Sequence, residues 1–171
     1  RVIHTSADFD YLNNMCFSKN AVKKAKEALK NGAAIITDTN MAYSGINKKA
    51  AAKYGVSIHC FMADEDVAKK ALERGETRAA VSMEKASGIK GPVIFAIGNA
   101  PTALIKLYEL IREGIFKPEV IIGVPVGFVN VVEAKELIMS LEDVEYIVAK
   151  GRKGGSNIAA AICNALLYNI E

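Results

Sequence analysis

Two short apolar runs, VIFAI at residues 93–97 and VIIGV at residues 120–124, constrain the fold of this chain more than any other feature. Each run is rich in Val and Ile and is followed by Gly or Pro, and a segment with helical periodicity separates the two. Such runs are typical of parallel strands that are buried on both faces and joined by a helix. The pair therefore predicts a βαβ unit whose strands end at the same edge of one sheet.

Similar alternation continues on both sides of this unit. Further strands are predicted at residues 33–37, 56–62 and 146–149, and helices at residues 20–31, 41–54 with an interruption at Gly45, 65–74, 78–87, 130–141 and 158–168. Residues 1–11 are too short and polar to form a core strand. Alternating strands and helices predict an α/β fold, with three α/β/α layers around a mainly parallel sheet of about five strands. A length of 171 residues suits one domain, spanning residues 1–171.

Composition excludes several classes of protein. The chain is 51% hydrophobic and 24% charged, as is usual for a soluble globular protein. A net charge of +3, with Lys and Arg interspersed among Glu, gives no reason to expect a nucleic-acid partner. No run approaches the ~20 apolar residues that span a bilayer, so no membrane partner is expected. The polar start does not resemble a signal peptide, and because it lacks Met we expect an N-terminal segment to be missing.

The cysteines favour a reducing compartment. Cys16, Cys60 and Cys163 are odd in number, far apart and without a CxxC pair. Free, mostly buried thiols of this kind are expected in the cytoplasm, and no residue is spaced to make one of them a nucleophile.

The segment after the first central strand predicts a helix start. Gly98 allows a sharp turn, Asn99 is a good N-cap, and Pro101 suits a first helical turn. The amides of this turn are expected to point outward, where they favour anions. The glycines of residues 123–128 are expected to let a ligand approach the backbone, and ligands of open parallel sheets bind at the carboxyl ends of the strands. Together the two loops predict a site for a ligand with negative groups.

Other polar residues fall at the same predicted edge. Asp38 follows a strand, where a functional role and helix capping are equally plausible. Arg78 opens a helix against its dipole, one turn from Ser82, and is explained either by solvation or by an anionic ligand. Arg152 and Lys153 lie in a glycine-rich turn before a helix, a pattern that favours anion binding.

The two histidines have different settings. His4 is either a hydrogen-bonded structural residue or a proton donor. His59 lies inside an apolar run, which favours a core or edge-strand role. The chain has no HExxH motif or clustered His and Cys, no GxGxxG and no GxxxxGK[ST], so neither a metal nor a dinucleotide site is predicted.

Several motifs taken together resemble one known family. GNAPTAL at residues 98–104, GVPVGFVNVVEAKE at 123–136 and GRKGGS at 151–156, with RVIHTSADFDY at the start and TDTNMAYSGI at 37–46, are similar to segments of the precorrin-8 methylmutases. The resemblance covers almost the whole chain in the right order. It implies an isomerase of cobalamin biosynthesis that moves a methyl group from carbon 11 to carbon 12 of a corrinoid ring. It also implies that no separate cofactor is needed and that the protein is a homodimer with its site near the subunit interface.

The resemblance also implies roles for individual residues. His4 matches the catalytic histidine, proposed to donate a proton or a hydrogen bond to the ring. Substrate contacts are implied at Thr5, Asp38, Asn40, Met41, Arg78, Ser82, Asn99, Ala100, Pro101, Thr102, Val126, Gly127, Phe128, Arg152, Lys153, Gly154, Gly155 and Ser156.

Three alternatives stay open at this point. The HTSADFD opening favours a cobalt-containing ring, cobalt-precorrin-8, over the metal-free precorrin-8X, which would give hydrogenobyrinic acid. A non-catalytic corrinoid-binding protein on the same scaffold would bind the product without converting its precursor. A phosphate or nucleotide enzyme rests on fold analogy alone.

Overall fold

The computed structural model describes residues 1–170 and is built on a six-stranded sheet in the order β1-β6-β5-β4-β2-β3. The strands are β1 (Met15–Phe17), β2 (Ala34–Thr37), β3 (Ser57–His59), β4 (Val93–Ile97), β5 (Val120–Gly123) and β6 (Glu145–Ala149). All neighbours are parallel except β1, which pairs antiparallel with β6. The mainly parallel sheet is therefore confirmed. The sequence did not predict β1, because three residues are too few to show a strand period.

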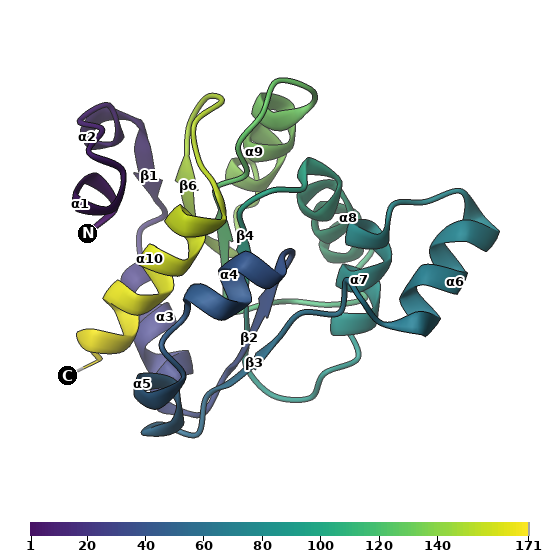
Figure 1. Ribbon diagram of the computed structural model, residues 1–171, viewed down its shortest axis with the longest axis horizontal. Coiled ribbons are helices and arrows are strands. Elements are labelled where there is room, and N and C mark those ends of the chain that lie inside the picture. The colour runs from purple at the N-terminus through teal and green to yellow at the C-terminus, as the bar shows by residue number, and fades with distance from the viewer. Residues whose placement is uncertain (171) are drawn as a thin grey trace.

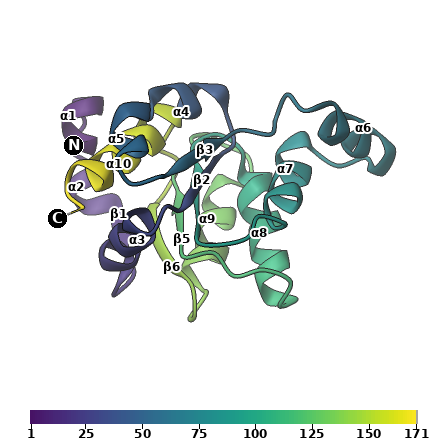
Figure 2. The same ribbon diagram turned by 90° about the horizontal axis from the view of Figure 1, so that it is seen from below.

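Helices cover both faces of this sheet (Figure 1). One face carries α3 (Ala21–Lys30), α4 (Asn40–Gly45), α5 (Lys48–Ala52) and α10 (Ser156–Tyr168), and the other α7 (Arg78–Ala86), α8 (Pro101–Arg112) and α9 (Val131–Met139). Short helices α1 (Val2–Ser6) and α2 (Tyr11–Asn14) lie beside α10, and α6 (Glu65–Arg74) projects beyond α7, as Figure 2 shows. The predicted three layers are confirmed.

The alternation of side chains along each strand divides the interior into two cores. In β4, Ile94 packs into the core beneath α10, whereas Phe95 packs into the core beneath α8, and both side chains are almost fully buried. A strand that is apolar on both faces needs helices on both sides to remove it from water. The continuous apolar run at residues 93–97 therefore determines the layered architecture.

Several helix ends lie where the sequence predicted them. The prediction of Asn99 as an N-cap is wrong, because the N-cap of α8 is Ala100 and no side chain caps this helix. Glu65 and Asp66 supply negative charge in the first turn of α6, which ends at Gly75 with φ 65°. The Thr77 side chain accepts a hydrogen bond from the Ala80 amide and begins α7. The helix predicted at residues 41–54 is divided into α4 and α5, and Asn47 caps the second part.

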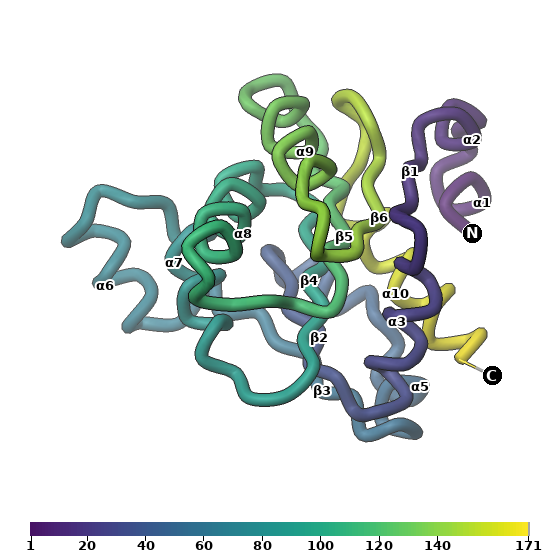
Figure 3. Tube along the Cα trace, turned by 180° about the vertical axis from the view of Figure 1, so that it is seen from behind, coloured from purple at the N-terminus to yellow at the C-terminus, as the bar shows by residue number. Residues whose placement is uncertain are grey.

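The strand order contains a topological switch point. In chain order, the five parallel strands are arranged second, first, third, fourth, fifth, so the direction of winding reverses between β2 and β4. The chain after β2 enters α4 on one face, and the chain after β4 enters α8 on the other. Ligands of doubly wound sheets bind at such a reversal. The first and last described helices lie at one side of the molecule, near both ends of the chain (Figure 3).

Candidate active site

Four turns that contain most of the predicted site residues follow the carboxyl ends of parallel strands. They comprise residues 38–41 after β2, 98–102 after β4, 124–128 after β5 and 151–156 after β6. In the sheet register, Thr37 pairs with Ala96, and Gly123 pairs with both Ile97 and Val148, so these turns begin at one edge. The structure therefore brings together segments that are far apart in the sequence (Figure 1).

The side chain of Asp38, which follows β2, binds the backbone amides just before α8. Its carboxylate is fully buried and accepts hydrogen bonds from the amides of Gly98 at 2.9 Å, Asn99 at 2.8 Å and Ala100 at 2.6 Å. Burial raises the pKa of Asp38, and the three amide hydrogen bonds act in the opposite direction. The prediction of outward-pointing amides is wrong for these three, because an internal carboxylate already binds them.

Glycines join the turns to one another. A Cβ atom on Gly98 would lie 2.6 Å from the Cα of Ser156, and one on Gly154 would lie 2.0 Å from the carbonyl oxygen of Val124. The Gly155 amide donates to that same Val124 oxygen at 2.8 Å. These positions need glycine because backbone packs against backbone, whereas the sequence predicted only a sharp turn at Gly98.

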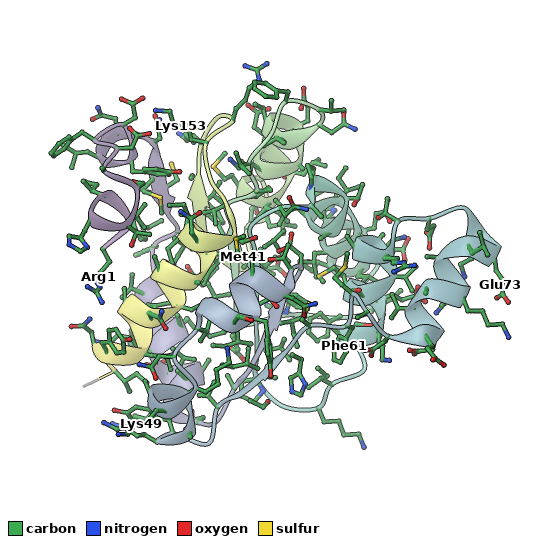
Figure 4. All side chains as sticks on the ribbon, in the orientation of Figure 1. Arg1, Met41, Lys49, Phe61, Glu73 and Lys153 are labelled. Atoms are coloured by element: carbon green, nitrogen blue, oxygen red, sulfur yellow. The ribbon has the colours of Figure 1, made fainter. Side chains whose placement is uncertain are left out.

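The starts of α4 and α10 also meet at this edge. The Thr39 hydroxyl caps α4 through the Ala42 amide and lies 2.7 Å from the hydroxyl of Ser156. Ser156 is buried, whereas Asn40 and Met41 are exposed on the first turn of α4, where Figure 4 labels Met41. Thr39 is a contact that the sequence reasoning missed, although its position before a helix is a capping signal.

The start of α7 lies against the start of α8. The Thr77 hydroxyl donates to the hydroxyl of Thr102 at 2.9 Å, and this contact holds the exposed Arg78 near the start of α8. Ser82 is fully buried, and its hydroxyl contacts the sulfur of Met62 at 3.5 Å. Arg78 is therefore placed to meet a ligand directly, whereas Ser82 faces protein.

His4 is exposed on α1, which packs against α10. One turn later, Asp8 and Asp10 bind the ammonium of Lys153 at 2.6 and 2.5 Å. These ion pairs join the segment after α1 to the 151–156 turn, and Figure 4 labels Lys153 beside that segment. Hydrogen bonds that Lys153 donates to Asp10 and Asp8 raise the pKa of Lys153 well above its ordinary value, and the bond that Asp8 accepts from Lys153 lowers the pKa of Asp8. Both carboxylates are ion-pair partners of Lys153.

Lys135 is a further residue beside the candidate site that the sequence reasoning missed. Its side chain on α9 is fully buried beneath the 151–156 turn, and the ammonium donates to the carbonyl oxygens of Gly151 at 2.7 Å and Lys153 at 2.9 Å. Burial lowers its pKa to about 8. Its helical spacing with the buried residues Val131, Ala134 and Ile138 was the available signal.

The exposed surface of the same edge combines apolar and cationic side chains. Phe128 is 85% exposed and Met41 69%, and Val126 is also exposed. Arg78 and Arg152 are exposed cations close to these turns. Such a surface suits a ligand with apolar faces and a negatively charged periphery.

One cavity lies beside His59 and another beside the first two helices. His59 ends β3 and lines a cavity of about 290 Å³ with Asn40; its Nε2 lies 3.0 Å from the Ser57 hydroxyl and its ring stacks on Phe61, as suits an edge-strand histidine. An apolar cavity of about 460 Å³ lies between α10 and the first two helices, and none of the predicted site residues lines it. Within residues 1–170, no three His, Cys, Asp or Glu side chains are placed to hold a metal ion. None of the described helices is long and apolar enough to span a membrane.

Comparison with known proteins gives one consistent result. A family model described as precorrin-8X methylmutase matches residues 1–169. Cobalt-precorrin-8 methylmutases from Leptospira interrogans and Salmonella typhimurium are each 45% identical, and the alignments cover 98% and 100% of this chain and 79% and 80% of theirs. The precorrin-8X methylmutase of Pseudomonas aeruginosa is 40% identical over 100% of this chain and 82% of its own. A crystal structure of the Thermus thermophilus precorrin-8X methylmutase matches with a TM-score of 0.90 at 36% identity, covering 99% of this chain and 82% of that one.

Proposed function

Because the chain belongs to the precorrin-8X methylmutase family, we propose that it moves a methyl group from carbon 11 to carbon 12 of cobalt-precorrin-8 and so forms cobyrinic acid. Methyl-shift isomerisation in cobalamin biosynthesis is the activity of the family and of this chain. The cobalt-containing substrate is supported by the names of the Leptospira and Salmonella relatives, which share 45% identity with the chain.

The observation that carries this proposal is the composition of the strand-end surface. A corrinoid precursor is a flat ring edged with acetate and propionate carboxylates. Exposed Met41 and Phe128 offer apolar area for its faces, and Arg78 and Arg152 offer charge for its periphery. Guanidinium groups are well suited to carboxylates because they form paired hydrogen bonds.

His4 is the proposed catalytic residue. In the reaction the methyl group leaves carbon 11 and bonds to carbon 12, so no oxidant or reductant is consumed and no separate cofactor is needed. Histidine is suited to donate a proton or a hydrogen bond to the ring near neutral pH and so ease the migration. Its exposure on α1 leaves the imidazole accessible to a substrate.

Replacement of His4 tests the catalytic assignment. His4→Ala should reduce turnover by roughly a hundred- to ten-thousandfold, as is typical for loss of a general acid, while product binding remains detectable. Turnover is measured from the absorbance change as the conjugation of the ring alters. His59→Gln is the matched control, because it changes the other histidine at the β3 edge and should leave turnover near the unmodified level. Full activity of His4→Ala would reject the assignment.

Whether the substrate contains cobalt is tested separately, by comparing the two forms of the ring. Relatives named for cobalt-precorrin-8 and for precorrin-8X both align with nearly the whole chain. The proposal predicts a higher kcat/KM for the cobalt-containing ring than for the metal-free ring. A preference for the metal-free ring would reverse that choice without altering the reaction.

We further propose a cytoplasmic homodimer whose subunit interface lies near the site. Large apolar side chains are exposed on the α1–α2 turn and after β5, including Phe9 at 76% and Phe128 at 85%, and a second subunit would remove them from water. Light scattering after size exclusion should give twice the chain mass. A monomer at micromolar concentration would contradict the proposal.

A further inference from the structure

A buried cation supports the glycine-rich turn from below. The ammonium of Lys135 donates to the carbonyl oxygens of Gly151 and Lys153 and has no exposed surface. The carbonyl oxygen between them, on Arg152, accepts from the Gly127 amide at 3.1 Å. Three consecutive carbonyl groups are therefore bound to α9 and to the turn after β5. The path of this turn is set by buried contacts rather than by solvent.

The same turn also binds the segment between α1 and α2. The ammonium of Lys153 contacts Asp8 at 2.6 Å and Asp10 at 2.5 Å, across more than 140 residues of sequence. The Asp10 amide in turn donates to the Asp8 carboxylate at 3.0 Å, which keeps the two acids together. The helix that bears His4 ends at Ser6, so the ion pairs of Asp8 and Asp10 with Lys153 lie directly after that helix.

We infer that Lys135 and Lys153 are positioning residues for the methyl shift: through the 151–153 turn and the Asp8–Asp10 pair they hold in place the segment that directly follows the His4 helix. The inference rests on the proposed role of His4. It also assigns Lys153 a task different from the substrate contact that the family resemblance implied. The carboxylates of the substrate are then left to Arg78 and Arg152, which have no carboxylate partner among residues 1–170.

Two variants separate positioning from substrate contact, because the two roles predict opposite results. If the ion pairs position His4, Lys153→Met and the double variant Asp8→Asn/Asp10→Asn should both lower kcat by about ten- to a hundredfold, with KM changed much less. If Lys153 contacts substrate, Lys153→Met should raise KM, whereas the aspartate variant should release the ammonium and lower KM. The second pattern would overturn the inference. Lys153→Arg should retain most activity, because a guanidinium also pairs with two carboxylates.

A double-mutant cycle tests whether the effect passes through His4. With His4→Ala already present, Lys153→Met should lower the residual turnover by less than about twofold, because coupled residues are not additive. Independent losses that multiply would overturn the inference. Lys135→Met should give the same coupling. If it fails to fold, Lys153→Met still decides, because the Lys153 side chain is 46% exposed and its removal leaves the core intact.

The unmodified chain and its His4→Ala variant distinguish failure of this inference from failure of the proposed function. If the unmodified chain does not convert the precursor, the proposed function fails. If it converts the precursor and His4→Ala does so equally well, the role of His4 fails and the inference fails with it. If His4→Ala is inactive and the lysine variants keep full kcat, only the positioning inference fails.

Discussion

At the scale of single residues, burial acts on two charged side chains beneath the strand ends. It raises the pKa of Asp38 and lowers the pKa of Lys135 to about 8, and in both cases it disfavours the charged form. Each group is retained because it binds backbone: Asp38 accepts from three amides, and Lys135 donates to two carbonyl groups. Neither is a surface charge, and both hold a turn of the site in place.

Asp38 should be hard to replace even by an isosteric side chain. In Asp38→Asn, one oxygen still accepts a hydrogen bond, but the amide nitrogen faces N–H donors that it cannot accept from. We expect the free energy of unfolding to fall by about 2–4 kcal/mol, from lost bonds and unsatisfied buried donors. Urea denaturation measures the change. The control is Asp143→Asn at an exposed residue whose ion pair with Lys117 spans 3.7 Å, and this change should shift the free energy of unfolding by less than about 0.5 kcal/mol.

Lys135 should make stability depend on pH above neutrality. Its folded pKa lies below its unfolded value, so between about pH 8 and pH 10 the unfolded chain binds more protons and the free energy of unfolding rises with pH. Relative to Lys135→Met, the unmodified protein should gain on the order of 1–3 kcal/mol between pH 7.5 and pH 10. Urea denaturation at the two pH values measures this gain, with the exposed Lys30→Met as control. An equal pH dependence in both proteins would contradict the burial of a charged lysine.

At the scale of elements, the site depends on how closely strand-end turns approach one another. Gly98 after β4 lies against the backbone at the start of α10, and Gly154 lies against the carbonyl group of Val124. Thr77 and Thr102 join α7 to α8 in a similar way through hydroxyl groups. The helix starts are therefore fixed relative to one another before any ligand binds, which lowers the entropic cost of binding.

Gly98→Ala tests this packing. The added Cβ would lie within 2.8 Å of three backbone atoms of residues 155 and 156, which cannot move as a side chain can. We expect the melting temperature to fall and the free energy of unfolding to decrease by roughly 1–3 kcal/mol or more. Gly88→Ala is the matched control, since its Cβ would meet only the Lys85 oxygen at 3.5 Å. Equal stability of both variants would mean that the close approach does not occur.

At the scale of the whole molecule, the central strands are packed on both faces, whereas α6 is packed against few buried residues. β4 and β5 lie between other strands, with both faces buried. α6 projects from the body, and its own small cluster contains only Val67, Ala71 and Val81 among fully buried residues (Figure 2). Local unfolding should therefore begin at α6 and reach the central strands last.

Hydrogen exchange measured by mass spectrometry checks this order. Amides of α6 should exchange fastest among helices longer than two turns, and those of β4 and β5 slowest, because opening the strands requires unfolding of both cores. α8 is the comparison helix, since Ala103, Leu104 and Leu107 are fully buried. Equal protection of α6 and α8 would show that α6 is held by contacts outside this chain.

Much of the fold could be predicted from local sequence. The runs at residues 93–97 and 120–124 became β4 and β5, because a strand without a polar face needs helices on both sides. α6 begins and ends at the predicted residues, 65 and 74. Turn glycines and strand ends likewise placed the candidate site at one edge of the sheet.

Other features were decided only by tertiary structure. Three contacts join segments that lie 60 to more than 140 residues apart. They are the pairing of β1 with β6, the hydrogen bonds from the amides before α8 to Asp38, and the ion pairs of Lys153 with Asp8 and Asp10. Periodicity reports which face of an element is buried, but not which distant backbone lies against it. The sequence by itself therefore determined the layers and the edge of the sheet that carries the candidate site, whereas the folded chain decided which charged side chains are exposed and which bind other parts of the protein.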